Sequence, residues 1–212
     1  MSEASLGIEE RSMRIIESEI GTHDYTAPQW SIVRRVIHAT ADFDFAKPYR
    51  NGIIFSANAI ESAFEALKKR RYIVVDVDMV QSGINKKSAA KIGTSVICNI
   101  SNKDVLNISK NENKTRSKVA MRYSSKEVDD GIVVIGNAPT ALYELVNMIK
   151  EGVARPLLVV GIPVGFVSAE ESKLELSKTN IEFITNIGRK GGSPAASSII
   201  NALMLMYINN LD

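Results

Sequence analysis

The sequence has little with which to build metal or redox chemistry. Its 212 residues include one cysteine, Cys98, and two histidines, His23 and His38. A single cysteine excludes an internal disulfide and a zinc cage of thiolates, and two histidines argue against a histidine-rich metal site. We therefore expect neither a metal bound by the protein nor a cofactor.

An excess of charge of one sign is also missing, because 26 lysines and arginines face 24 aspartates and glutamates. The resulting net charge of +2 creates no overall field toward nucleic acid or a membrane surface, so we expect neither as a partner. The first residues have no basic segment followed by an apolar run, and no uninterrupted apolar stretch reaches the roughly 18–20 residues of a membrane span. We expect a cytoplasmic protein.

What is present is the composition of a globular protein, with 45% hydrophobic and 24% charged residues. The length favours one domain over residues 1–212. Apolar residues at helical spacing predict three N-terminal helices, at residues 8–20, 28–40 and 56–70.

The pattern changes after Arg70, where short runs rich in β-branched residues predict buried strands. These runs are residues 72–77, 95–100, 132–136, 157–161 and 181–187, and helical patterns between and after them cover 86–91, 115–123, 139–150, 169–178 and 194–208. The polar stretch 101–118 is interpreted as a mobile excursion. The sequence therefore predicts a doubly wound α/β domain with a parallel sheet and helical N-terminal additions.

Four of the predicted strand ends lead into loops rich in glycine or polar residues, at 76–79, 136–140, 161–165 and 188–193. Open α/β sheets bind ligands beyond the carboxyl ends of their strands. Backbone N–H groups and helix N-termini converge there and attract anions. We expect a ligand that carries carboxylates or phosphates.

His38 is the candidate acid–base residue, because it lies on a patterned helix whereas His23 precedes that helix. Arg35 lies one turn earlier on the same face, and Asp42 could orient the imidazole if the helix extends that far. The alternative is that these residues form a solvated polar stripe. No serine nucleophile motif accompanies them.

Two other features have a structural as well as a functional interpretation. Asp76 and Asp78 face opposite ways if the strand continues, and capping of the strand end is the favoured interpretation of both. Residues 188–193 resemble a phosphate loop, but the sequence contains no recognised phosphate-binding pattern. The alternative for this loop is close packing against the sheet.

Six motifs in the same order resemble the precorrin-8X methylmutase family, also called cobalt-precorrin-8 methylmutase, of corrin biosynthesis. They are Glu10-Arg-Ser12, Arg35-Val-Ile-His38, Asp76-Val-Asp-Met79, Gly136-Asn-Ala-Pro-Thr-Ala141, Pro163-Val-Gly-Phe-Val167 with Glu171-Ser-Lys173, and Arg189-Lys-Gly-Gly-Ser193 with Asn201-Ala-Leu203. The resemblance extends from about Glu10 to Leu203 and is weakest over residues 103–114.

The resemblance implies a flavodoxin-like fold, a homodimer with the ligand near the subunit interface, and an isomerase that acts as an intramolecular methyl transferase. Family members move a methyl group from C-11 to C-12 of a tetrapyrrole by an acid-catalysed 1,5-sigmatropic shift. The substrate is precorrin-8X, giving hydrogenobyrinate, or cobalt-precorrin-8, giving cobyrinate. The motifs do not distinguish these two substrates, and any cobalt would arrive within the macrocycle.

The resemblance also assigns roles to particular residues. His38 is the proton donor and acceptor for the ring C nitrogen, while Ser12 and Arg35 contact the substrate. Arg116 is a further substrate contact, and Asn137, Gly192 and Ser193 are candidate contacts in the loops. Two alternatives are a non-catalytic carrier of a tetrapyrrole or another polyanion and a flavin-binding relative, which the missing phosphate loop argues against.

Overall fold

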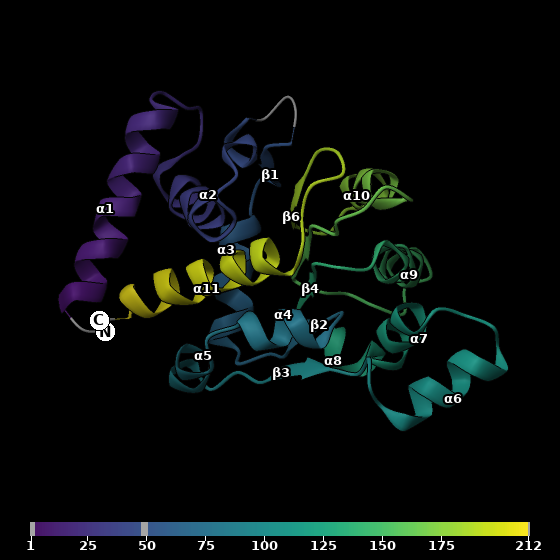
Figure 1. Ribbon diagram of the computed structural model, residues 1–212. Coiled ribbons are helices and arrows are strands. Elements are labelled where there is room, and N and C mark those ends of the chain that lie inside the picture. Colours follow the sequence, from purple (N-terminus) through teal and green to yellow (C-terminus); the bar gives the residue numbers. More distant parts are fainter. Residues whose placement is uncertain (1–2, 48–50, 212) are drawn as a thin grey trace.

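A computed structural model describes residues 3–47 and 51–211, and its centre is a six-stranded sheet (Figure 1). The strand order is β1-β6-β5-β4-β2-β3. The strands are β1 (Ile53–Phe55), β2 (Ile73–Val75), β3 (Val96–Cys98), β4 (Ile132–Ile135), β5 (Leu158–Gly161) and β6 (Phe183–Asn186). All neighbours are parallel except β1, which pairs antiparallel with β6. Without β1 this is the flavodoxin-like order, which confirms the predicted fold class.

Helices cover both faces of the sheet, as expected for parallel strands buried on both sides (Figure 1). One face packs against α2 (Ala27–Thr40), α3 (Ala59–Lys68), α4 (Asp78–Gly83), α5 (Lys86–Ile92) and α11 (Ser193–Asn209), and the other against α7 (Arg116–Tyr123), α8 (Ser125–Val128), α9 (Pro139–Lys150) and α10 (Ala169–Ser177). Outside these layers, α1 (Glu3–Ile20) lies on α2, and α6 (Lys103–Asn111) lies on α7.

Helix α2 begins and ends as its sequence predicts. Thr26 forms a capping box with Gln29, and the apolar stripe of Ile32, Val33, Val36 and Ile37 is at most 1% exposed. At the other end Ala41 adopts the left-handed conformation, with φ of 53°, and its N–H bonds the carbonyl oxygen of Ile37 at 2.7 Å. The short 3-10 helix η1 (Phe43–Ala46) follows, so the chain changes direction three residues after His38.

The uncharged helix α11 is buried within the chain itself. It packs on α2, α3, α4 and α5, and most of its side chains are inaccessible. A second subunit is therefore not needed to explain why this helix lacks charge. Among the residues that the structure describes, no helix is long and apolar enough to cross a membrane.

Three expectations about the elements are corrected. Strand β1 was not expected, the helix predicted from residue 56 begins at Ala59, and the stretch 101–118 is not a mobile excursion. Most of that stretch is α6 and the start of α7. The side chain of Asn102 caps α6 by accepting the N–H of Asp104 at 2.9 Å, and Val105 is buried against α7. Helical packing of this one apolar face outweighs the polar composition.

Candidate active site

His38 is exposed near the end of α2 and makes a hydrogen bond with a helix from another part of the sequence. Its Nδ1 lies 2.8 Å from the hydroxyl oxygen of Ser12 on α1. The buried face of α2 carries its apolar stripe, so the imidazole is on the outer face, where α1 packs. The structure thus brings together two of the residues predicted for the site.

Arg35 lies on the same face of α2 but already has a partner. Its Nη2 donates to Oε1 of Glu9 at 2.8 Å, and both side chains are partly exposed. Both residues also line a groove of about 490 Å³ between α1 and α2, together with Glu10, Met13, Arg14, Glu17 and Arg34. The guanidinium carries five N–H groups, so the bond to Glu9 leaves donors for a second carboxylate.

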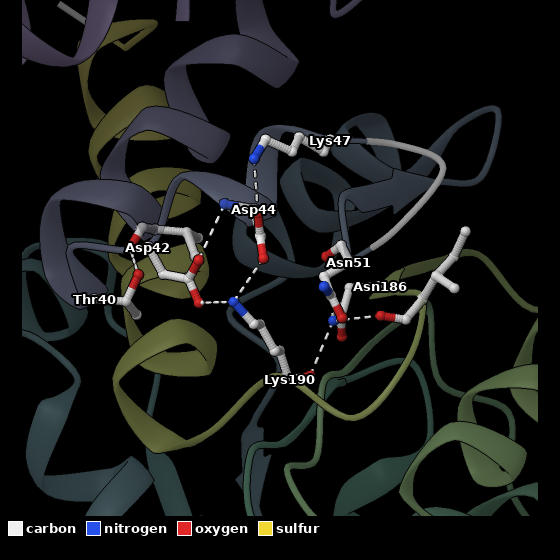
Figure 2. A network of polar contacts seen from close by, with 9 residues as sticks. Thr40, Asp42, Asp44, Lys47, Asn51, Asn186 and Lys190 are labelled. Carbon is white, nitrogen blue, oxygen red and sulfur yellow. Dashed lines mark hydrogen bonds and ion pairs between the residues drawn. The ribbon is translucent and has the colours of Figure 1, made fainter. Parts of the chain in front are cut away.

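Asp42 does not orient His38, contrary to one expectation. Since α2 ends at Thr40 and Ala41 reverses the backbone, Asp42 is not on the helical face of His38. Its carboxylate instead caps η1 and accepts a bond from Nζ of Lys190 at 2.7 Å (Figure 2). Lys190 belongs to the loop that follows β6, so this ion pair brings the end of α2 to the carboxyl edge of the sheet.

Asp76 lies at the end of β2, where the strand order reverses. It is 2% exposed, and its carboxylate accepts the N–H groups of Gly136, Asn137 and Ala138 at 3.1, 2.9 and 2.7 Å. Burial raises the pKa of Asp76, and the bonds from these N–H groups oppose the rise. The expectation that these groups bind an external anion is wrong, because an internal carboxylate occupies them.

The capping interpretation is therefore confirmed for Asp76. The strand ends at Val75, so Asp78 does not lie on a continuing strand. It begins α4, where it is exposed and accepts a bond from the hydroxyl of Ser101 at 3.0 Å.

The glycine-rich loop between β6 and α11 passes directly over the end of β5. The N–H of Gly192 bonds the carbonyl oxygen of Ile162 at 3.0 Å, and a Cβ on Gly191 would lie 2.2 Å from that oxygen. Close packing therefore requires glycine at position 191. Ser193, the first residue of α11, is buried, and its Cα lies 3.0 Å from where a Cβ of Gly136 would be. The two candidate loops are thus in contact.

Lys173 on α10 holds the other side of this loop. Although it is only 2% exposed, its Nζ donates to the carbonyl oxygens of Gly188 and Lys190 at 2.9 and 2.6 Å. Burial lowers the pKa of Lys173 to about 7, against the opposing effect of Glu170. A buried amine with a lowered pKa therefore anchors the loop.

We expect the stability that depends on Lys173 to increase with pH. The pKa is about 7 in the folded chain and 10.5 in the unfolded chain, so between these values only the unfolded chain retains the proton. The wild type should therefore gain stability relative to Lys173→Met: the difference between their free energies of unfolding should rise by about 2 kcal/mol between about pH 7 and pH 9. Urea denaturation measures this difference. Lys178→Met, at an exposed ion pair, is the control, and a pH-independent difference for Lys173→Met would contradict the assigned pKa.

Arg116 lies across the sheet from His38. Arg116 is the exposed first residue of α7, which shares the face of α9, whereas α2 covers the opposite face (Figure 1). The hydroxyls of Thr115 and Thr140 lie 3.1 Å apart and join the N-termini of α7 and α9. Asn137 is exposed in the loop before α9. Arg116 has no described contact with His38.

Sequence reasoning missed the partners of the predicted residues. Glu9, Lys173 and Lys190 were given no role, although Lys173 and Lys190 stand in two of the quoted motifs. Their partners are distant in sequence, as for Lys190 and Asp42, which are 148 positions apart. A motif indicates that a residue is constrained, but spacing within one helix reveals only neighbours on that helix.

Known proteins resemble this chain over nearly its whole length. A family model described as precorrin-8X methylmutase matches residues 7–206. A cobalt-precorrin-8 methylmutase of Priestia megaterium is 47% identical over 94% of this chain and 87% of its own length, and a precorrin-8X methylmutase of a Sinorhizobium species is 32% identical over 92% of each chain. The crystal structure of the Thermus thermophilus precorrin-8X methylmutase has a TM-score of 0.87 at 36% identity, covering 96% of this chain and 98% of its own. The chain belongs to the precorrin-8X methylmutase family of isomerase enzymes, as its motifs predict.

Proposed function

We propose that this protein moves a methyl group from C-11 to C-12 of precorrin-8X or cobalt-precorrin-8 by an acid-catalysed 1,5-sigmatropic shift. The observation that carries the proposal is the exposed imidazole of His38, held by Ser12 near the carboxyl edge of an α/β sheet. The names of the relatives support the substrate class. The product is hydrogenobyrinate from the metal-free substrate or cobyrinate from the cobalt form.

In this mechanism His38 places a proton on the ring C nitrogen and later removes it. When Nε2 exchanges the proton, Nδ1 keeps its hydrogen in both the imidazolium and the neutral imidazole, and the hydroxyl oxygen of Ser12 accepts this Nδ1–H in both states. Ser12 therefore keeps the ring in one orientation through both steps. Nε2 is then the nitrogen that exchanges the proton with the substrate.

A rearrangement within one molecule needs a fixed geometry rather than a nucleophile. The acetate and propionate arms of the macrocycle suit cationic partners, and Arg35 is one helical turn from His38. Arg116, Asn137, Gly192 and Ser193 are proposed as further contacts. Because Arg116 starts from the opposite face of the sheet, the ring would lie across the carboxyl edge, or a second subunit would supply part of the pocket.

We expect Arg35→Ala to weaken binding more than it slows the reaction. Loss of a charged hydrogen bond to a carboxylate arm should cost about 1.5–3 kcal/mol of affinity for the product. Titration of hydrogenobyrinate or cobyrinate measures it. Glu9→Gln is the matched control, since it removes the negative charge of the internal partner at 2.8 Å but leaves the guanidinium available, and it should bind no more weakly than wild type. An unchanged dissociation constant in Arg35→Ala would remove the assigned role.

We also propose that the protein is a homodimer. Large apolar side chains are exposed at Ile8 and Ile15 on α1 and at Phe166 and Val167 in the loop after β5, with Phe166 87% exposed. Light scattering should give about twice the chain mass of 23.2 kDa. A mass near that of one chain across a wide concentration range would contradict this proposal.

The single domain over residues 1–212 and the cytoplasmic location remain predictions.

One measurement separates an enzyme from a carrier. Pure protein is mixed with precorrin-8X or its cobalt form, and the absorbance spectrum is followed over time. Conversion to the corrin chromophore supports the methylmutase, whereas binding without conversion supports a tetrapyrrole carrier. A yellow preparation that releases flavin would instead support the flavin-binding alternative.

A further inference from the structure

Lys190 forms a bridge between two parts of the chain that are distant in sequence. Its Nζ lies 2.7 Å from Oδ2 of Asp42 and 2.8 Å from Oδ2 of Asp44, and Figure 2 shows it between the two carboxylates. Both aspartates belong to the turn and 3-10 helix directly after α2. The side chain of Lys190 therefore holds the segment that immediately follows the helix of His38.

The backbone of Lys190 is fixed as firmly as its side chain. Its carbonyl oxygen accepts bonds from Nζ of Lys173 at 2.6 Å and from Nδ2 of Asn186 at 2.9 Å. The next residue, Gly191, packs so closely on Ile162 and Pro163, directly after β5, that a Cβ would meet their backbone atoms. The backbone of the loop is therefore held in place, and the ion pairs of Lys190 connect the segment after α2 to it.

The electrostatics favour a lysine at this place. Without a cation, two carboxylates at one site would repel each other. The ammonium groups of Lys190 and Lys47 lower the pKa of Asp44 to about 2. All three side chains of the bridge are partly exposed, at 39% for Lys190, 26% for Asp42 and 27% for Asp44. Ion pairs with this exposure contribute little to overall stability, so the main consequence of the bridge is geometric.

We propose that Lys190 is a positioning residue for the methyl shift: its bridge sets the distance between His38 and the loop of Gly192 and Ser193. This inference rests on the proposed function, because it takes His38 as the proton carrier and the loop as a substrate contact. Lys190 acts through the end of α2 and need not contact the substrate. Loss of the bridge would let the imidazole move relative to the bound ring.

The test compares Lys190→Met, Lys190→Arg and Lys47→Met in steady-state turnover of precorrin-8X. A small displacement of a catalytic group reduces turnover strongly, so Lys190→Met should lower kcat about tenfold and change KM by less than about threefold. Lys190→Arg should recover most of kcat, because a guanidinium can bond both carboxylates. Lys47→Met is the matched control, since Lys47 bonds the same Asp44 at 2.9 Å without reaching the loop. It should stay within about twofold of wild type.

Hydrogen exchange of the free protein provides a readout that does not depend on the reaction. Lys190→Met should accelerate amide exchange at both the end of α2 and residues 188–192, whereas Lys47→Met should not. This measurement tests the bridge itself, so it remains informative even if His38→Ala is active and the proposed function is wrong. If Lys190→Met does not fold, Asp42→Asn tests the same bridge while retaining a capping side chain, and should lower kcat about threefold.

Three results would overturn the inference. One is a kcat of Lys190→Met, or of Asp42→Asn in its place, equal to that of wild type. Another is an equal loss of kcat in Lys190→Met and Lys47→Met. The third is a failure of Lys190→Arg to recover activity despite a wild-type melting temperature, since a bridge made by charge must tolerate the other cation.

Discussion

His38→Ala is expected to lose methyl migration while it still binds the corrin product. General acid–base catalysis typically contributes roughly 10²–10⁴-fold, and a loss of this size in single-turnover rate is the expected result. Product affinity should persist, because the proposed carboxylate contacts come from Arg35 and Arg116 rather than from the imidazole. Absorbance traces after mixing with precorrin-8X measure the rate, and titration of the product measures the affinity.

His38→Gln is the matched control for shape and hydrogen bonding. A glutamine amide can still bond the Ser12 hydroxyl that lies 2.8 Å from Nδ1 in the wild type, but it cannot carry a proton near neutral pH. It should therefore be as slow as His38→Ala. Ser12→Ala should be slowed less than either, since it removes the orienting bond and leaves the proton carrier. A His38→Ala rate within about threefold of wild type, well inside the ~10²-fold expectation, would mean that the proton comes from another group.

The parallel strands could be predicted because burial on both faces requires continuous apolar sequence. The run at 132–136 became β4, which is buried along its whole length, and the run at 157–161 became β5 in the same way. Strand β1 has only three residues, Ile53–Phe55, and exists because it pairs with β6, 130 residues later. Such a strand depends on its distant partner, and no local pattern of three residues indicates it.

The candidate site could be predicted only as separate motifs. Helical spacing correctly placed Arg35 and His38 on one face of one helix, but it suggested Asp42 as the third member. The structure shows that Ala41 ends the helix and that Ser12, from another helix, bonds the imidazole. A left-handed alanine is unfavourable in isolation, so the local sequence gives no signal that α2 ends before Asp42.

Asp76→Ala is expected to be the most destabilising of the substitutions considered. The buried carboxylate of Asp76, at the end of β2, accepts the N–H groups of Gly136, Asn137 and Ala138 in the loop that leads into α9. Removing it leaves three N–H groups without their acceptor. The bonds from Gly136 and Ala138 are buried, and each unsatisfied buried donor costs about 1–3 kcal/mol, so the free energy of unfolding should fall by about 2–6 kcal/mol.

Urea denaturation of Asp76→Ala, Asp76→Asn and Asp78→Ala tests this role. Asp76→Asn keeps one oxygen acceptor but turns an NH₂ group toward an N–H donor, so it should lie between wild type and Asp76→Ala. Asp78 is the matched control, because it is two residues away, exposed, and bonded to a surface serine at 3.0 Å. Its replacement should cost less than about 1 kcal/mol. Equal losses in Asp76→Ala and Asp78→Ala would show that the three N–H groups find other acceptors, and that the carboxylate does not hold the loop of Asn137.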